Sequence, residues 1–131
     1  MAEGGGFELI RHGERVEGLA QGIDRQHLLR LRRGEWRVER RVDLHGLTAP
    51  EARRELASEL QDAVAEGVRC VLVIHGRGLH SESGPVLRDG VLTWLTAPPL
   101  AQRVMAFASA LPRDGGPGAS YVLLRRTRLG A

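Results

Sequence analysis

Two short motifs, about thirty residues apart, combine side chains that could move protons at one site. Val-Asp-Leu-His-Gly occupies residues 42–46, and Ile-His-Gly-Arg-Gly occupies residues 74–78. A carboxylate such as Asp43 can hold the imidazole of His45 in one tautomer and raise its basicity. His75 could supply a second proton-transfer group, because two rings that titrate near neutrality can act as base and acid at physiological pH. Asp43, His45 and His75 are therefore the candidate catalytic residues.

The second motif also carries groups suited to binding a phosphate. Gly76 and Gly78 let the backbone approach a ligand closely, and their amides can face an anion. Arg77 between them can neutralise charge that develops on a phosphate during reaction. A glycine-rich turn near residues 114–118 would open on the same edge if the strand before it is parallel to the other two. Its candidate contacts are Gly116 and Gly118.

The elements around the motifs predict that they meet. Apolar runs over 37–44 and 68–74 are typical of strands, and a helix is expected between them. Thr48 and Glu51 match a capping box at the start of that helix. A strand, a crossover helix and a second strand make a parallel pair, so both strands end at one edge of the sheet, where ligands bind.

The remaining segments complete an α/β fold of the two-layer α+β type. We expect a second helix over 85–95, a third strand over 103–109 and a fourth over 121–126. The order βαβαββ predicts a four-stranded mixed sheet carrying two helices. Residues 1–36 are expected to be a partly disordered amino-terminal arm with a short helix near 24–32, and residues 37–131 to be the folded domain.

The composition is that of an ordinary soluble protein, with 42% hydrophobic and 27% charged residues. No apolar run approaches the roughly 20 residues that span a bilayer. The amino terminus lacks the basic and apolar regions of a signal peptide. The single cysteine, Cys70, excludes a disulfide within the chain. A cytoplasmic location is expected.

The 19 basic residues are all arginine, although the formal net charge is only +3. Seven of them fall within residues 25–41 beside two glutamates, a local excess of five positive charges. Arg32 and Arg33 are the candidate nucleic-acid contacts in this stretch. Aromatic residues make up only 4% of the chain, so phosphate contacts should dominate over base stacking.

Two alternative interpretations of the motifs remain open. A single histidine at a strand end is usually structural, but two at equivalent ends of parallel strands favour a shared site. Asp43, His45 and His75 could also bind a divalent metal, since they form a mixed nitrogen and oxygen set. Mg²⁺ prefers several oxygen ligands, and only one carboxylate is available here. The leading interpretation requires no cofactor, and Mg²⁺ is the alternative.

Taken together, the motifs closely resemble the Smr (small MutS-related) domain in its stand-alone bacterial form. The resemblance rests on Val-Asp-Leu-His-Gly-Leu-Thr, Val-Ile-His-Gly-Arg-Gly, Val-Leu-Arg at 86–88 and Asp-Gly-Gly-Pro-Gly-Ala-Ser-Tyr-Val-Leu-Leu at 114–124, in this order, over roughly residues 40–126. It implies a fold similar to the carboxyl-terminal domain of bacterial translation initiation factor three. It also implies endonuclease activity, with Asp43, His45 and the His75–Gly78 motif as functional residues.

Three functions follow as expectations. The first is an RNA endonuclease, acting without metal through the two histidines, with ribosome-associated messenger RNA as one substrate. The second is a DNA-nicking endonuclease that uses Mg²⁺. The third is a non-catalytic nucleic-acid or ribosome-binding module. The two-histidine mechanism requires the rings at positions 45 and 75 to face one phosphate-sized hollow.

Overall fold

The structure is a computed structural model that describes residues 6–77 and 84–126. Its strands are β1 (Phe7–His12), β2 (Arg15–Ala20), β3 (Arg40–Asp43), β4 (Cys70–Ile74), β5 (Val104–Ser109) and β6 (Ala119–Leu124). Its helices are α1 (Arg25–Arg32), α2 (Ala49–Ala65) and α3 (Gly84–Leu95). Short 3-10 turns cover Leu100–Arg103, Pro112–Asp114 and Gly116–Gly118. No helix in these described ranges is long and apolar enough to cross a membrane.

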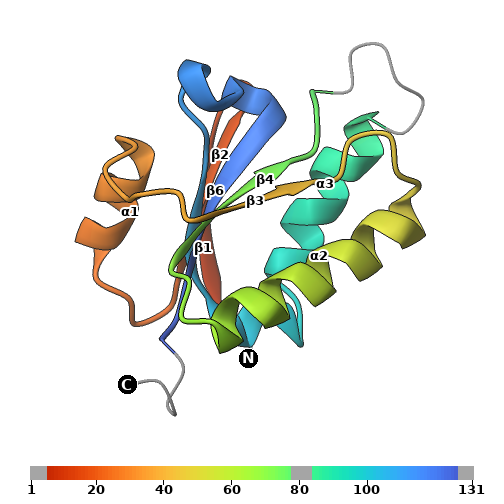
Figure 1. The fold of residues 1–131 in the computed structure, drawn as a ribbon. Coiled ribbons are helices and arrows are strands. Elements are labelled where there is room, and N and C mark those ends of the chain that lie inside the picture. Colours follow the sequence, from red (N-terminus) through yellow and green to blue (C-terminus); the bar gives the residue numbers. More distant parts are fainter. Residues whose placement is uncertain (1–5, 78–83, 127–131) are drawn as a thin grey trace.

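The strands form one mixed sheet in the order β1-β2-β5-β6-β4-β3. β3 and β4 are parallel, while every other neighbouring pair is antiparallel. Since β6 runs against both β4 and β5, the strands β3, β4 and β5 all point the same way. Their carboxyl ends therefore share one edge, at the upper end of the sheet in Figure 1. The turn between β5 and β6 opens on that edge.

The helices lie on both faces of this sheet. α2 and α3 pack on one face, and α1 packs on the other (Figure 1). Each face has its own hydrophobic cluster. The strands β4, β5 and β6 are buried on both sides, so the sheet forms the middle layer of the molecule.

The sheet has six strands where four were expected, because the described part of the amino-terminal arm is folded. Gly13 and Glu14 close a two-residue hairpin between β1 and β2, with Gly13 at a φ of 61°. Such hairpins place glycine where φ must be positive. β2 then pairs with β5, and α1 buries Leu28 and Leu31 completely. Residues 7–34 thus belong to the same sheet and core as the expected domain.

The predicted start of α2 is confirmed, and it fixes the turn that follows β3. The Thr48 hydroxyl accepts a hydrogen bond from the Glu51 amide, and the Glu51 carboxylate accepts one from the Thr48 amide. Leu44 extends the ladder beyond β3 through a bond from its amide to the Ile74 carbonyl. His45 is therefore held in a short turn between a strand end and a capped helix.

Candidate functional site

Asp43 and His45 form a hydrogen-bonded pair at the carboxyl end of β3. Oδ1 of Asp43 lies 2.6 Å from Nδ1 of the His45 ring and 3.1 Å from the His45 amide nitrogen. The His45 side chain is 70% exposed and that of Asp43 is 52% exposed. The spacing of two residues thus brings the carboxylate and the imidazole together, as the sequence predicted.

The contact fixes how His45 can act. An ionised carboxylate only accepts hydrogen bonds, so Nδ1 of His45 carries the proton in this contact. The lone pair of the neutral ring then lies on Nε2, away from Asp43. Partial burial alone would raise the pKa of Asp43, but the hydrogen bonds from the His45 ring and amide lower it below its ordinary value. Asp43 is consequently ionised at neutral pH and suited to orient a base.

His75 occupies a different environment. It is only 3% exposed, at the end of β4. Its Nδ1 lies 2.9 Å from the Gly76 carbonyl oxygen, and its Nε2 lies 3.0 Å from the Ser120 hydroxyl. A neutral ring satisfies both contacts by donating to the carbonyl and accepting from the hydroxyl. Both nitrogens of His75 are therefore engaged inside the protein.

The two histidines also lie on opposite faces of the sheet. His75 follows Val73 by two residues, and Val73 packs under α2 and α3. Leu44 packs on that same face, so its neighbour Asp43 points to the other. His45 shares the side of Asp43 because the two are bonded. The expected hollow shared by His45 and His75 is not formed, and direct proton transfer by His75 does not fit this geometry.

The segment at residues 75–76 and the turn at residues 116–118 lie side by side, and they form hydrogen bonds to each other. The Gly118 carbonyl accepts hydrogen bonds from the amides of His75 and Gly76, at 3.0 and 2.8 Å. The amides of Gly116 and Gly118 donate to the carbonyls of Leu111 and Gly115. The amides of Gly76, Gly116 and Gly118 are therefore occupied, and the expectation that they face an anion is corrected. Gly78 lies outside the described residues.

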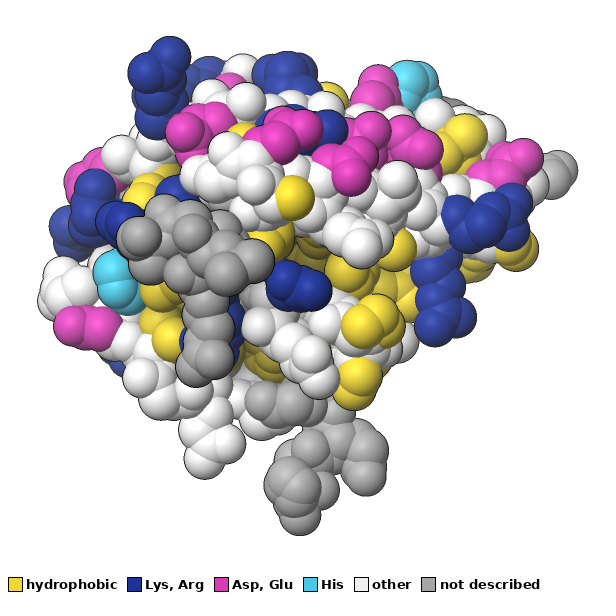
Figure 2. Space-filling model, turned by 60° about the horizontal axis from the view of Figure 1, so that its bottom comes forward, with side chains coloured by type: hydrophobic (Ala, Val, Ile, Leu, Met, Phe, Trp, Pro, Cys, Tyr) yellow, Lys and Arg dark blue, Asp and Glu magenta, His cyan; other side chains and the backbone are white. Residues whose placement is uncertain are grey.

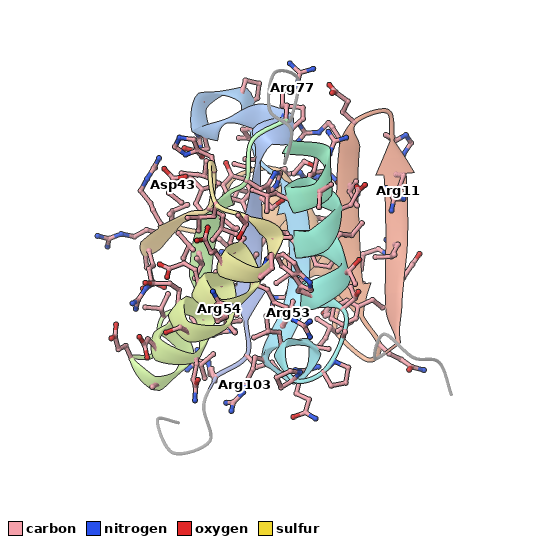
Figure 3. The ribbon with its side chains drawn as sticks, turned by 90° about the vertical axis from the view of Figure 1, so that its right-hand side faces the viewer. Arg11, Asp43, Arg53, Arg54, Arg77 and Arg103 are labelled. Carbon is pink, nitrogen blue, oxygen red and sulfur yellow. The ribbon has the colours of Figure 1, made fainter. Side chains whose placement is uncertain are left out.

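Arg77 lies at the same end of the molecule as Asp43 (Figure 3). Its guanidinium is partly exposed and contacts Oε1 of Glu14, in the β1–β2 turn, at 2.5 Å. The other carboxylate oxygen of Glu14 lies 3.8 Å from Nη1 of Arg88 on α3. Arg77 is thus a phosphate-binding candidate that is engaged by an internal carboxylate.

Much of the basic stretch is paired with acidic side chains. Arg32 forms two hydrogen bonds to the Glu17 carboxylate, at 2.5 and 2.7 Å, so it is not the free cation that we expected. Arg33 is exposed at the end of α1. Figure 2 shows arginine and acidic side chains close together, with several acidic groups in a row along one side of the face. Arg25 and Arg40 of the stretch are also paired with glutamates, so the positive excess of residues 25–41 is partly offset by nearby carboxylates.

The expected metal ligands are not assembled. In the part of the chain that the structure describes, no group of three or more histidine, cysteine, aspartate or glutamate side chains could hold a metal ion. Asp43 and His45 are bonded to each other, and His75 faces the other side of the sheet. The three residues do not fit the metal site that the sequence left open.

The burial of His75 predicts that the stability of the fold depends on pH. Burial lowers the pKa of His75 below its ordinary 6.5, and the positive charge of Arg88 acts in the same direction. In the unfolded chain this ring therefore binds protons at a higher pH than in the folded chain. The free energy of unfolding should decrease as pH falls below about 6.5. Urea unfolding at pH 7.5, 6.0 and 5.0 measures this, and the decrease should be smaller in His75→Gln.

Glu14, Arg88 and Ser120 are polar partners to which the sequence analysis gave no role. Arg88 and Ser120 lie within motifs quoted for the resemblance, whereas Glu14 comes from a hairpin turn outside those motifs. Gly13-Glu14 between two alternating segments was the available signal for a hairpin, and it would have located Glu14 at a strand end.

Comparisons with known proteins place these features in a family. The family model described as the Smr domain matches residues 42–125. A relative from Escherichia coli strain K12, called "Probable DNA endonuclease SmrA", is 39% identical over 114 residues, which is 86% of this chain and 57% of that protein. A "Ribosome rescue factor SmrB" from Photobacterium profundum is 38% identical over 103 residues, covering 79% of this chain and 54% of that protein. The chain thus spans little more than half the length of these curated relatives.

Solved structures agree with the fold. YdaL, described as a stand-alone small MutS-related protein from Escherichia coli, superposes with a TM-score of 0.71 at 36% identity, over 84% of this chain and 82% of that one. The Smr domain of Thermus thermophilus MutS2 superposes with a TM-score of 0.57 at 36% identity, over 66% of this chain and 98% of that domain.

Proposed function

The chain belongs to the Smr domain family, and from this premise we propose that it is a nucleic-acid endonuclease whose reactive pair is Asp43 and His45. The observation that carries the proposal is the 2.6 Å contact between these side chains, with the imidazole exposed at the edge where β3, β4 and β5 end. An exposed base held by a carboxylate is suited to take a proton from a bound nucleophile.

RNA is the substrate that this pair suits best. In the proposed reaction, Nε2 of His45 accepts the proton of a ribose 2′-hydroxyl, and the 2′-oxygen forms a bond to the adjacent phosphorus. The bond from phosphorus to the 5′-oxygen breaks, and the leaving oxygen takes a proton from solvent. Asp43 orients His45, and Arg77 binds the backbone of the nucleic acid at the same end of the sheet. The products are a 2′,3′-cyclic phosphate and a 5′-hydroxyl.

His75 has a positioning role in this proposal in place of the acid role expected from the sequence. Its ring connects the Gly76 carbonyl to the Ser120 hydroxyl on β6. Gly76 directly precedes Arg77, so the ring helps to hold the chain segment that presents the guanidinium. The relatives called ribosome rescue factors favour ribosome-associated RNA as a source of substrate and the ribosome as a partner.

The ends of the products test this reaction. A labelled RNA oligonucleotide incubated with the chain in the presence of a chelator should be cleaved to fragments that end in 2′,3′-cyclic phosphate. A 2′-O-methyl RNA of the same sequence should stay intact, because its nucleophile is blocked. Fragments with 3′-hydroxyl ends, or equal cleavage of the 2′-O-methyl RNA, would contradict the 2′-hydroxyl mechanism.

A second candidate is DNA nicking, which is favoured by the name of the Escherichia coli relative. DNA has no 2′-hydroxyl, so the nucleophile would be water activated by His45. Supercoiled plasmid incubated with and without Mg²⁺ distinguishes the two functions. Conversion of the plasmid to open circles, under conditions that leave RNA intact, would favour DNA nicking. Intact RNA and intact plasmid with salt-dependent binding would instead indicate a non-catalytic binding module.

A further inference from the structure

A cavity on the α3 side of the sheet is lined by Glu14, the residue that contacts Arg77, and not by Asp43 or His45. Its volume is about 60 Å³, which exceeds the space that one water needs. Its polar lining includes Glu14, His75, Arg88, Ser109 and Ser120. Arg11 and Asp89 also line it, and its apolar lining includes aliphatic side chains of α3 and the ring of Phe107. The cavity thus combines apolar side chains with several polar and charged groups.

Arg88, which lines this cavity, carries an unused hydrogen-bond donor. Its Nη1 is buried and has no hydrogen-bond partner among the described residues. The nearest acidic oxygen is Oε2 of Glu14, at 3.8 Å, beyond hydrogen-bond distance. Buried donors are nearly always satisfied in native proteins, so this group indicates an acceptor beyond those that residues 6–77 and 84–126 supply.

Glu14 occupies the place where such an acceptor would bind. Its two oxygens face two different guanidiniums, Arg77 at 2.5 Å and Arg88 at 3.8 Å. A phosphate diester also presents two anionic oxygens on one centre, and guanidinium groups bind both kinds of anion. Glu14 therefore makes the contacts that a phosphate would make, and it makes the second one poorly.

We propose that Arg77 and Arg88 form a phosphate-binding subsite for the backbone of a bound nucleic acid, and that Glu14 is its internal competitor. The subsite rests on the proposed function and extends it by placing a neighbouring phosphate on the α3 side of β4. When a phosphate enters, it replaces Glu14 between the two guanidiniums and supplies the missing acceptor for Nη1 of Arg88.

Binding measurements on Glu14→Gln test the competitor. The change keeps the shape of the side chain and removes its charge. In a His45→Ala background, which is designed to prevent cleavage, it should raise affinity for a short single-stranded RNA about tenfold at roughly 0.1 M salt. Glu55→Gln on α2 is the matched control, since it changes net charge equally away from the cavity. Equal gains in the two variants would overturn the proposal.

Arg88→Met tests the cation. It should lower RNA affinity, remove the gain caused by Glu14→Gln, and reduce the slope of log affinity against log salt by about 0.7, the value for one phosphate on a single strand. Arg103→Met, at the opposite end from Arg77 in Figure 3, is the control. If Arg88→Met lowers the unfolding midpoint, Arg77→Met tests the same subsite from its exposed side. Persistence of the Glu14→Gln gain in both arginine variants would refute the assignment.

The affinity of the parent chain and of Glu14→Gln for inorganic phosphate is a separate measurement. A gain in affinity of Glu14→Gln for inorganic phosphate together with RNA supports the subsite. A gain for inorganic phosphate without any gain for RNA would overturn the assignment to a nucleic-acid backbone. Because these readouts are binding constants, they are independent of cleavage. A chain that shows the expected binding changes but cleaves no RNA would contradict the proposed endonuclease activity and leave the phosphate subsite supported.

Discussion

Replacement of His45 by alanine is expected to slow phosphodiester cleavage by about 10²–10⁴-fold, the usual contribution of a general base. The His45 ring is exposed, and its partner Asp43 is already in contact with solvent, so removing the ring leaves no buried group without a hydrogen bond. The unfolding midpoint and the affinity for RNA should therefore stay near those of the parent chain. Single-turnover rates measured with saturating protein separate this loss from weaker binding.

The matched control for this variant is His12→Ala. His12 is an exposed histidine at the end of β1, distant in the sheet from β3. The His12→Ala chain should cleave RNA at the parental rate. A His45→Ala chain that keeps cleavage within about threefold of His12→Ala would exclude His45 as the base, since that difference is well below the usual contribution.

Asp43→Asn tests the orientation of the same ring. The amide keeps the size of the side chain but can also donate a hydrogen bond, so it no longer selects the tautomer with the proton on Nδ1 of His45. Cleavage should fall without loss of stability. The hydrogen bonds that lower the pKa of Asp43 keep its carboxylate ionised at mildly acidic pH, so loss of its charge should not limit the parental rate there.

The parts of the molecule that could be predicted from sequence are those governed by local contacts. The capping box of Thr48 and Glu51 marks the start of α2, because both partners lie within one helical turn. Asp43 pairs with His45 only two positions along the chain, in the turn where its carboxylate also accepts a hydrogen bond from the His45 amide. Each signal involves residues at most three positions apart.

The face on which His75 lies could not be predicted in the same way. Strand β4 is apolar on both sides, so its sequence has no alternation that assigns a residue to one face. A shift of one residue moves a side chain to the other side of the sheet. His45 and His75 therefore lie at the same edge of the sheet but on opposite faces, and they do not share a site.

The ion pairs of Arg32 and Arg77 could not be predicted from the sequence either. Arg32 meets Glu17 across 15 positions, and Arg77 meets Glu14 across 63. Both glutamates come from a hairpin that the sequence analysis assigned to a partly disordered arm. Once that hairpin joins the sheet through β5, its carboxylates neutralise arginines that would otherwise count as free.

Replacement of His75 by alanine is expected to lower the free energy of unfolding by about 2–4 kcal/mol, because it removes the partner of the half-buried Ser120 hydroxyl and leaves a cavity in place of a buried ring. Cleavage should also fall, since the segment that presents Arg77 loses its side-chain contact with Ser120 on β6. The expected kinetic effect is a weaker apparent affinity for RNA, with part of the rate recovered at saturating concentrations.

His75→Gln separates positioning from catalysis. An amide side chain can donate to the Gly76 carbonyl or accept from Ser120, but it cannot transfer a proton near neutral pH. Partial recovery of both stability and cleavage in this variant is the expected result, measured by urea unfolding and single-turnover rates. A His75→Ala chain that unfolds like the parent, and loses cleavage as completely as His45→Ala with no recovery in His75→Gln, would show the ring acting in the chemical step. Because both ring nitrogens are already hydrogen-bonded inside the protein, positioning is the role that the geometry favours.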